Sequence, residues 1–184
     1  EIDGQFDGFD SLNTSSLDPI SNFTFEYCLF EGAGFNFSLF RPALGFERMV
    51  NDTFQVEHCV FRHGGGLFVQ GSPQGEITQN EFYDMIADAL SVQARYQVDL
   101  EITCNYIHDA YDSQAGIHIF TDDSDKQILV ENNVVHDVNK VYGRGIYIFN
   151  EFNPFNGVPP NFQQNRGEIL LRNNLIFNSH IGMD

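Results

Sequence analysis

The sequence contains no tryptophan and has only two lysines, Lys126 and Lys140, against 26 aspartate and glutamate residues. Its formal net charge is therefore −17. Nucleic acids and anionic lipid surfaces are bound through basic patches, so this charge argues against both as partners. It also argues against a polyanionic polysaccharide, unless a divalent cation bridges the negative charges.

Long apolar runs are absent as well. No run approaches the roughly 18 residues that a membrane-spanning helix needs, so we expect no membrane insertion. The chain shows neither a starting methionine nor a signal-peptide pattern, which predicts a processed chain or a section of a larger one. The length of 184 residues is enough for one domain with a core, and the 19 phenylalanines suggest that this core is built on aromatic and aliphatic side chains.

Similar short stretches recur along the chain, for example TCNYIHDA (103–110), ENNVVHDV (131–138) and RNNLIFNS (172–179). Six copies align on a central Asn or Cys, called the anchor here. Apolar residues fill the columns three before and two after the anchor in all six copies. The anchors, which are 31, 21, 25, 28 and 41 residues apart, are Cys28, Cys59, Asn80, Asn105, Asn133 and Asn174.

A second alternating segment follows most anchors, as in GIHI (116–119) and GIYI (145–148). Alternation of apolar and polar residues is typical of a strand with one buried face, and no amphipathic helical stretch is present. Repeats of 20–50 residues indicate a solenoid. We therefore predict an all-β fold, a right-handed parallel β-helix solenoid of about six coils. Stacked side chains of Asn80, Asn105, Asn133 and Asn174 would form an internal Asn ladder that bonds the backbone at each turn.

The anchor pattern, the Asn ladder and the glycine before the second strand resemble the right-handed parallel β-helix repeats of the pectin-lyase-like superfamily. The resemblance covers residues 20–184, with 1–19 as an irregular N-terminal coil or partial rung and 151–166 as a long inserted loop. It implies the fold but leaves the function open, because that superfamily includes lyases, hydrolases, epimerases and non-catalytic adhesins.

The second strands predict an outward face on which polysaccharide lies in that superfamily. Exposed aromatic rings and amides suit sugar binding. In a lyase or epimerase, His118 would be the base, Tyr147 the acid, and Arg144 the group that neutralises a uronate. The alternative is that these side chains decorate the surface or pack beneath a loop. The other residues expected on this ligand face are Gln70, Gln93, Phe120, Phe149 and Arg95.

Acidic residues gather in two places. Asp84, Asp109 and Asp137 share a column four residues after the anchor, and His108 and His136 precede two of them. Such a stack indicates a calcium site or a catalytic His/Asp group, or else carboxylates that cap turns. The turn containing Asp122, Asp123 and Asp125 could hold calcium or be a solvated acidic turn. No cofactor is required by the sequence, and calcium is the one that these residues suit.

Cysteines and glycosylation sequons bear on the compartment. Cys28 and Cys59 occupy the anchor column of adjacent coils, which predicts a disulfide, with two buried thiols as the alternative. Cys104 is expected to be a free, half-buried thiol. Clustered sequons predict a secreted eukaryotic glycoprotein, with chance matches as the alternative. The four sequon asparagines are Asn13, Asn22, Asn36 and Asn51.

Two functions follow from these observations. The first is a secreted, N-glycosylated module that acts as a structural or adhesive component of an extracellular assembly and contacts glycans. Its partners would be other copies or extracellular proteins, packed end-to-end or laterally. The alternative is a polysaccharide lyase or C5-epimerase acting on a polyuronate.

Overall fold

The computed structural model of the chain describes residues 2–3, 9–13, 23–31, 44–94, 98–110, 115–121, 126–138, 143–150 and 168–183. Within these residues every regular element is a β-strand, and all strand pairs are parallel. No described segment forms a helix that is long and apolar enough to cross a membrane. The prediction of an all-β parallel solenoid is confirmed.

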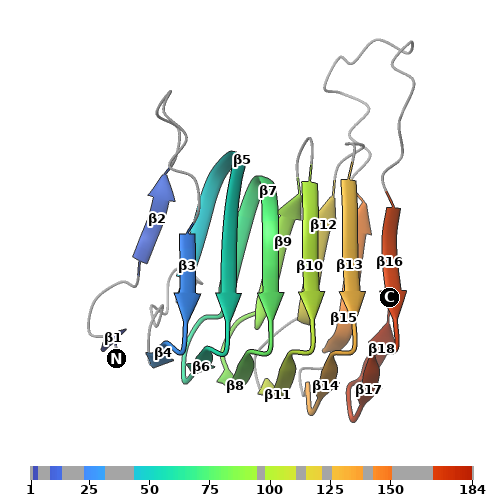
Figure 1. The fold of residues 1–184 in the computed structure, drawn as a ribbon. Coiled ribbons are helices and arrows are strands. Elements are labelled where there is room, and N and C mark those ends of the chain that lie inside the picture. The colour runs from blue at the N-terminus through green and yellow to red at the C-terminus, as the bar shows by residue number, and fades with distance from the viewer. Residues whose placement is uncertain are drawn as a thin grey trace.

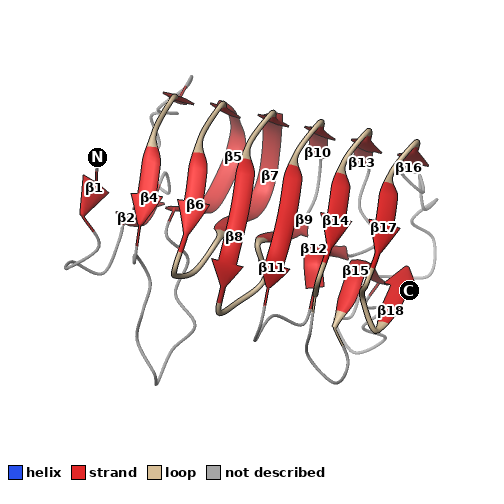
Figure 2. Cartoon of the chain, turned by 90° about the horizontal axis from the view of Figure 1, so that it is seen from below, coloured by secondary structure: helices blue, strands red, loops and turns tan. Residues whose placement is uncertain are grey.

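One wall of the solenoid is a seven-stranded sheet, seen in front in Figure 2. Each anchor stretch contributes one strand, so successive copies of the repeat lie side by side in chain order. The N-terminal β1 extends this sheet beyond β4. In spatial order the strands are β1 (Ile2–Asp3), β4 (Leu29–Glu31), β6 (Val60–Arg62), β8 (Glu81–Met85), β11 (Tyr106–Ala110), β14 (Val134–His136) and β17 (Leu175–Phe177).

The other sheet has eleven strands and forms two walls, because β5 (Leu44–Glu57) and β7 (Leu67–Thr78) continue around the corner between them. One wall, facing the viewer in Figure 1, also contains β3 (Phe23–Glu26), β10 (Val98–Thr103), β13 (Lys126–Glu131) and β16 (Glu168–Arg172). The wall behind it also contains β2 (Phe9–Asn13), β9 (Leu90–Ala94), β12 (Ala115–Thr121), β15 (Arg144–Asn150) and β18 (Ile181–Met183).

The predicted Asn ladder is present. Each Nδ2 donates to the Oδ1 of the anchor in the next coil, at 3.0 Å from Asn80 to Asn105, from Asn105 to Asn133 and from Asn133 to Asn174. The same Nδ2 also donates to a strand carbonyl of the preceding coil, such as Val56 O for Asn80, at 2.9 Å. Asn80, Asn105 and Asn133 are at most 1% exposed, so these buried amides are fully paired.

The core is a stack of apolar side chains from the columns seen in the sequence. Phe30, Phe61 and Phe82 lie parallel, with ring centroids 4.6 and 4.7 Å apart, and all are buried. The one glycine in the otherwise apolar column five before the anchor, Gly75, has a packing reason. A Cβ there would lie 2.2 Å from Phe54 O and 2.8 Å from the Phe54 ring, so the phenylalanine fills the space of two residues.

The disulfide prediction is not borne out by the structure, in which all three cysteines are free thiols. The adjacent strand positions Leu29 and Val60 are paired, so the cysteine backbones are within reach of a disulfide. The sulfurs instead donate to carbonyls, from Cys28 to Glu26 O at 3.5 Å and from Cys59 to Glu57 O at 3.2 Å. Cys104 is exposed rather than half-buried.

The ladder predicts a stability defect in Asn105→Ala. This change removes the oxygen that accepts from the backbone and side-chain amides of Asn80. Because those buried N–H groups lose their hydrogen-bond acceptor, the free energy of unfolding should fall by roughly 3 kcal/mol. Urea unfolding followed by circular dichroism measures it. Gln127→Ala, at an exposed position of β13, is the control and should change stability by less than about 0.5 kcal/mol. Equal small losses in both variants would contradict a stabilising ladder.

The thiols predict selective alkylation. Burial raises the pKa of Cys59 to about 11, so its reactive thiolate is scarce until the pH approaches that value. At pH 8 we expect iodoacetamide to modify the exposed Cys104 and to leave Cys59 intact, as read by peptide mass spectrometry. If Cys28 and Cys59 still resist alkylation after unfolding without reductant, they form the disulfide instead.

Candidate functional site

The outward side of β7 (its Leu67–Gly71 part), β9, β12 and β15, named the β12 face, brings together most of the predicted site residues. The parallel register pairs His118 with Tyr147, and Phe120 with Phe149. The His118 and Tyr147 rings are stacked with centroids 4.9 Å apart, and the two phenylalanine rings are 5.5 Å apart. Each pair belongs to a row of side chains that runs across the strands.

Sequence reasoning missed the partner that orients His118. Nδ1 of His118 lies 2.8 Å from Oδ2 of Asp88, whose Oδ1 accepts a hydrogen bond from the Ala115 amide at 2.9 Å. A carboxylate only accepts, so Nδ1 carries the hydrogen and Nε2 has the lone pair in the neutral ring. Nε2 makes no hydrogen bond to any described residue. The signal available in the sequence was an aspartate placed directly before the second strand of its coil.

Arg144 completes this group from the first position of β15. Its guanidinium carbon lies 4.1 Å from the centroid of the Tyr147 ring, a cation–π contact. His118, Tyr147 and Arg144, the three residues that the sequence analysis named as candidates, therefore lie in one group. The arrangement places a base, a phenol and a fixed positive charge within one group.

The second row carries amides and phenylalanines. Gln70 Nε2 donates to Gln93 Oε1 at 2.8 Å, and the register continues from Gln93 to Phe120. Phe149, at the end of this row, is 41% exposed. Arg95, predicted to flank the row, lies outside the described residues.

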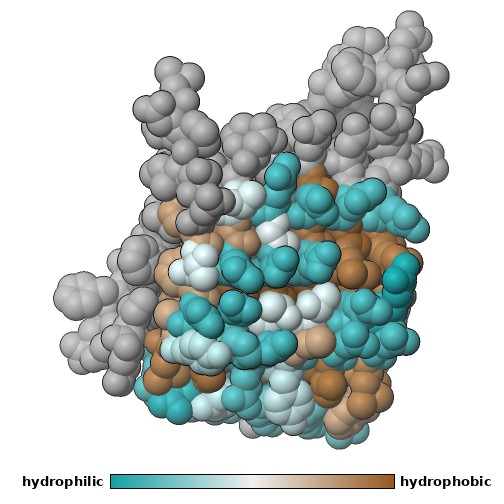
Figure 3. All heavy atoms as spheres, viewed as in Figure 1, coloured by the Kyte–Doolittle hydropathy of each residue, from teal (hydrophilic) through white to brown (hydrophobic). Residues whose placement is uncertain are grey.

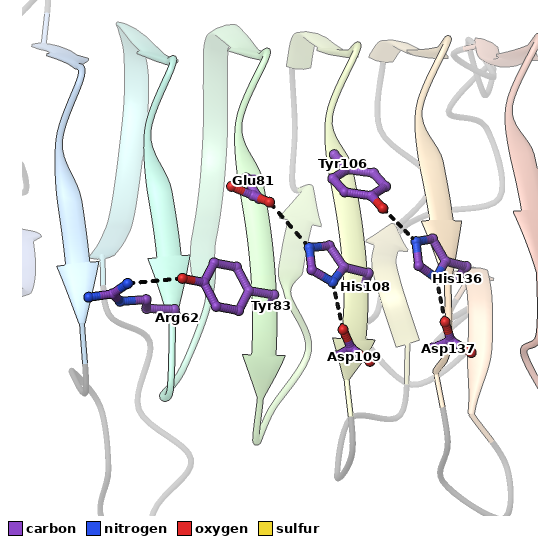
Figure 4. Close-up of polar contacts among 8 residues, drawn as sticks. All are labelled: Arg62, Glu81, Tyr83, Tyr106, His108, Asp109, His136 and Asp137. Carbon is purple, nitrogen blue, oxygen red and sulfur yellow. Dashed lines mark hydrogen bonds and ion pairs between the residues drawn. The ribbon is translucent and has the colours of Figure 1, made fainter.

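A different set of polar residues lines the outward side of the seven-stranded sheet, named the β11 face (Figure 4). Planar side chains stack from strand to strand, with centroids 5.3 Å apart for Tyr83 and His108, 5.5 Å for His108 and His136, and 4.6 Å for His136 and Phe177. Arg62 stands before Tyr83 and donates to its hydroxyl at 3.0 Å. This row was recognised only in part from the sequence.

Arg62 also pairs with Glu31 at 2.8 Å. The hydrogen bond from Arg62 lowers the pKa of the Glu31 carboxyl, and the same bond raises the pKa of Arg62 further above its usual range. Both side chains are about one-third exposed, at 32% and 36%, so solvent screens this pair and its contribution to stability is small. The N-terminal end of the row is thus electrically neutral.

Two His–Asp pairs occupy the C-terminal half of the β11 face. His108 Nδ1 lies 2.7 Å from Asp109, and its Nε2 lies 3.3 Å from Glu81 Oε1. His136 Nδ1 contacts Asp137 at 2.5 Å, and its Nε2 lies 2.9 Å from the Tyr106 hydroxyl. The hydrogen bond from His136 is the main reason that the pKa of Asp137 is lowered. Each imidazole is held on both nitrogens.

A known family model matches the chain over the whole repeat region. The family described as "Right handed beta helix region" covers residues 12–182. The chain belongs to the right-handed β-helix family. Neither the curated proteins nor the solved structures contain a significant match, so the family relation supports the fold and handedness of this β-helix but names no substrate.

The backbone of the β-helix explains why aspartates recur after the anchor. The described residues four after the anchor have φ between 51° and 56°, and those one before it have φ between 50° and 58°. Asn and Asp tolerate this left-handed conformation better than most residues, which accounts for Asp84, Asp109, Asp137 and Asn178 at the first of these columns. The turn interpretation of the column is therefore supported, and two of its members additionally hold histidines.

Other predicted sites of this right-handed β-helix are only partly described. No group of three or more metal-ligating side chains occurs among the described residues, and Asp122, Asp123 and Asp125 lie outside them. Asn22, Asn36 and the 151–166 loop also lie outside. Asn13 ends β2. Asn51 lies within β5, where the register shifts between Val50 and Thr53.

The β10-containing wall, which faces the viewer in Figure 1 and is formed by β3, β5, β7, β10, β13 and β16, presents bands of hydrophilic residues in Figure 3. A hollow on this wall is lined by acidic, amide and hydroxyl side chains, with Phe23 and Phe54 beneath them. Its outward-facing residues include Thr24, Gln55, Glu76, Asp99 and Glu101. It holds none of the predicted site residues.

Proposed function

We propose that this right-handed β-helix binds a polysaccharide along its β12 face, as a structural or adhesive module of a secreted, N-glycosylated protein. The observation that supports this most strongly is the composition of that face. Arg144 is the only Asp, Glu, Lys or Arg in β9, β12 and β15, although the chain has a net charge of −17. An amide and aromatic surface in so acidic a protein suits a ligand with many hydroxyl groups and few charges.

The geometry adds a reason for an extended ligand. Adjacent strands are about 4.8 Å apart, so Gln70, Gln93, Phe120 and Phe149 follow one another at a regular interval across β7, β9, β12 and β15, beside the His118–Tyr147 pair. Aromatic faces stack on sugar rings, while Gln70 and Gln93 can exchange hydrogen bonds with hydroxyls. Partners of an assembly would be other copies or extracellular proteins.

Phe149→Ala tests the binding face. Loss of an exposed ring that stacks on sugar should weaken binding to the best ligand of a panel of soluble neutral polysaccharides about 10-fold, as measured by affinity electrophoresis or calorimetry. Phe177→Ala is the matched control, because Phe177 is 42% exposed, Phe149 is 41% exposed, and Phe177 lies on the other sheet. Equal loss in both variants, or no binding by the folded wild type, would refute a β12-face site.

A lyase or C5-epimerase acting on a polyuronate is the second candidate, and the His118–Asp88 pair favours it. With Nδ1 held by Asp88, Nε2 of His118 can take the C5 proton. Tyr147 can protonate the leaving oxygen, and Arg144 can neutralise the uronate carboxylate. Calcium would serve the same neutralising purpose for a polyanion approaching an acidic protein.

A proton NMR time course on alginate, pectate and glucuronan, with calcium and then with EDTA, tests this chemistry. Unsaturated or epimerised sugar signals are expected, and His118→Gln should lower the rate at least about 100-fold because it removes the base. His180→Gln, which changes an exposed histidine in the turn before β18, is the control and should leave the rate unchanged. A flat spectrum with every polymer would leave binding without catalysis.

A further inference from the structure

The β11 face contains a hydrogen-bonded series that neither proposal above uses. The Tyr106 hydroxyl lies 2.9 Å from His136 Nε2, and His136 Nδ1 contacts Asp137 at 2.5 Å (Figure 4). A nucleophile in contact with a base, and the base in contact with an orienting carboxylate, is the arrangement that activates side chains for covalent catalysis. Tyr106 is 42% exposed, whereas the His136 side chain is 13% exposed.

We propose that the β11 face is a second, separate catalytic site for glycosyl transfer, in which Tyr106 is the nucleophile. The inference rests on the proposed function only in taking a polysaccharide as the class of substrate. The hydrogen-bond partners set the direction of proton transfer. Because the Asp137 carboxylate accepts from Nδ1–H, Nε2 of the neutral ring accepts from the Tyr106 hydroxyl, which prepares the phenol oxygen to attack.

A second proton-handling pair lies beside the nucleophile. Glu81 and Tyr106 are register partners on adjacent strands, so their side chains leave the sheet next to each other. Glu81 Oε1 contacts His108 Nε2 at 3.3 Å, and His108 Nδ1 contacts Asp109 at 2.7 Å. The Tyr106 and His108 rings are 4.6 Å apart. Glu81, 43% exposed, is therefore placed to exchange a proton with the oxygen that leaves or enters.

The local charge selects the type of reaction. Glu81, Asp109 and Asp137 are carboxylates around one phenol, and the one guanidinium of the row, Arg62, is already paired with Glu31. A negative environment opposes the anionic transition states of acyl and phosphoryl transfer. It stabilises the positive, oxocarbenium-like transition state of glycoside cleavage. The site therefore fits a glycoside, preferably neutral or cationic, rather than an ester.

The reaction balances with water as the only other reactant. The Tyr106 oxygen bonds to the anomeric carbon while its proton passes to His136 Nε2. The glycosidic carbon–oxygen bond breaks, and the leaving oxygen takes the proton held between Glu81 and His108. Water then attacks the anomeric carbon and returns a proton to the Glu81–His108 pair. The Tyr106 oxygen leaves and recovers its proton from His136, so the sugar is released with retained configuration.

Trapping of the covalent intermediate tests the site. The probes are 2,4-dinitrophenyl 2-deoxy-2-fluoro glycosides of several sugars, since the fluorine slows the second step and lets the adduct accumulate. We expect the intact mass to rise by one fluoroglycosyl group, mapped by peptide mass spectrometry to Tyr106. Tyr106→Phe should abolish labelling, and His136→Ala should slow it at least 10-fold.

Tyr83→Phe is the matched control, because Tyr83 lies on the same face but its hydroxyl bonds to Arg62. It should be labelled at the wild-type position and rate. Absence of any adduct on the folded protein across the panel, or labelling that persists in Tyr106→Phe, would overturn the proposal. If the protein binds polysaccharide, Phe149→Ala weakens that binding and no adduct forms, only the β12-face function is supported. If an adduct forms on Tyr106 but no Phe149-dependent binding is found, only the β11-face site is supported.

Discussion

The interaction on which the rest of the molecule depends is the hydrogen bond from one anchor amide to the next. Asn105 and Asn133 each accept from the backbone and side chain of the preceding anchor and donate both to the following anchor and to a strand carbonyl. A shift of one residue in any coil would break these bonds and turn its apolar columns outward. The ladder therefore fixes the register, while the turns between coils remain able to differ in length.

A fixed register also decides what the surface can do. Since equivalent positions of successive coils are neighbours, a change of residue type in one column produces a row of contacts rather than an isolated group. The β12 face becomes a row of amides and rings in this way, and the β11 face becomes a stack of phenol, imidazole and phenyl groups. The residue types in each column therefore determine what each face can bind or catalyse. The two faces are independent because the core separates their strands.

The sequence predicted the features that repeat and missed those that depend on the third dimension. Anchors and apolar columns repeat in every coil, so the strands, the ladder and the meeting of His118 with Tyr147 could be predicted. Asp88 and Tyr106 could not, because each contacts a residue from a different column of the neighbouring coil, 30 residues away in both cases. The disulfide prediction used backbone spacing and the expected secreted context, whereas each sulfur in the structure points to a nearby carbonyl. The left-handed turn columns contain Tyr, His, Gln, Cys, Asn and Asp, too varied to signal a common conformation.

Charge then separates the roles of the walls. The chain has a net charge of −17. Carboxylates lie on the β10-containing wall and around the histidines of the β11 face, whereas β9 and β12 contain none. Short-range contacts with a neutral sugar are unaffected by distant charges, which salt screens beyond about 8–10 Å. A developing positive charge, by contrast, gains from carboxylates a few ångströms away. The β12 face, whose strands β9 and β12 carry no charged residue, is therefore suited to holding a polymer. The acidic β11 face with its oriented imidazoles is suited to cleaving one.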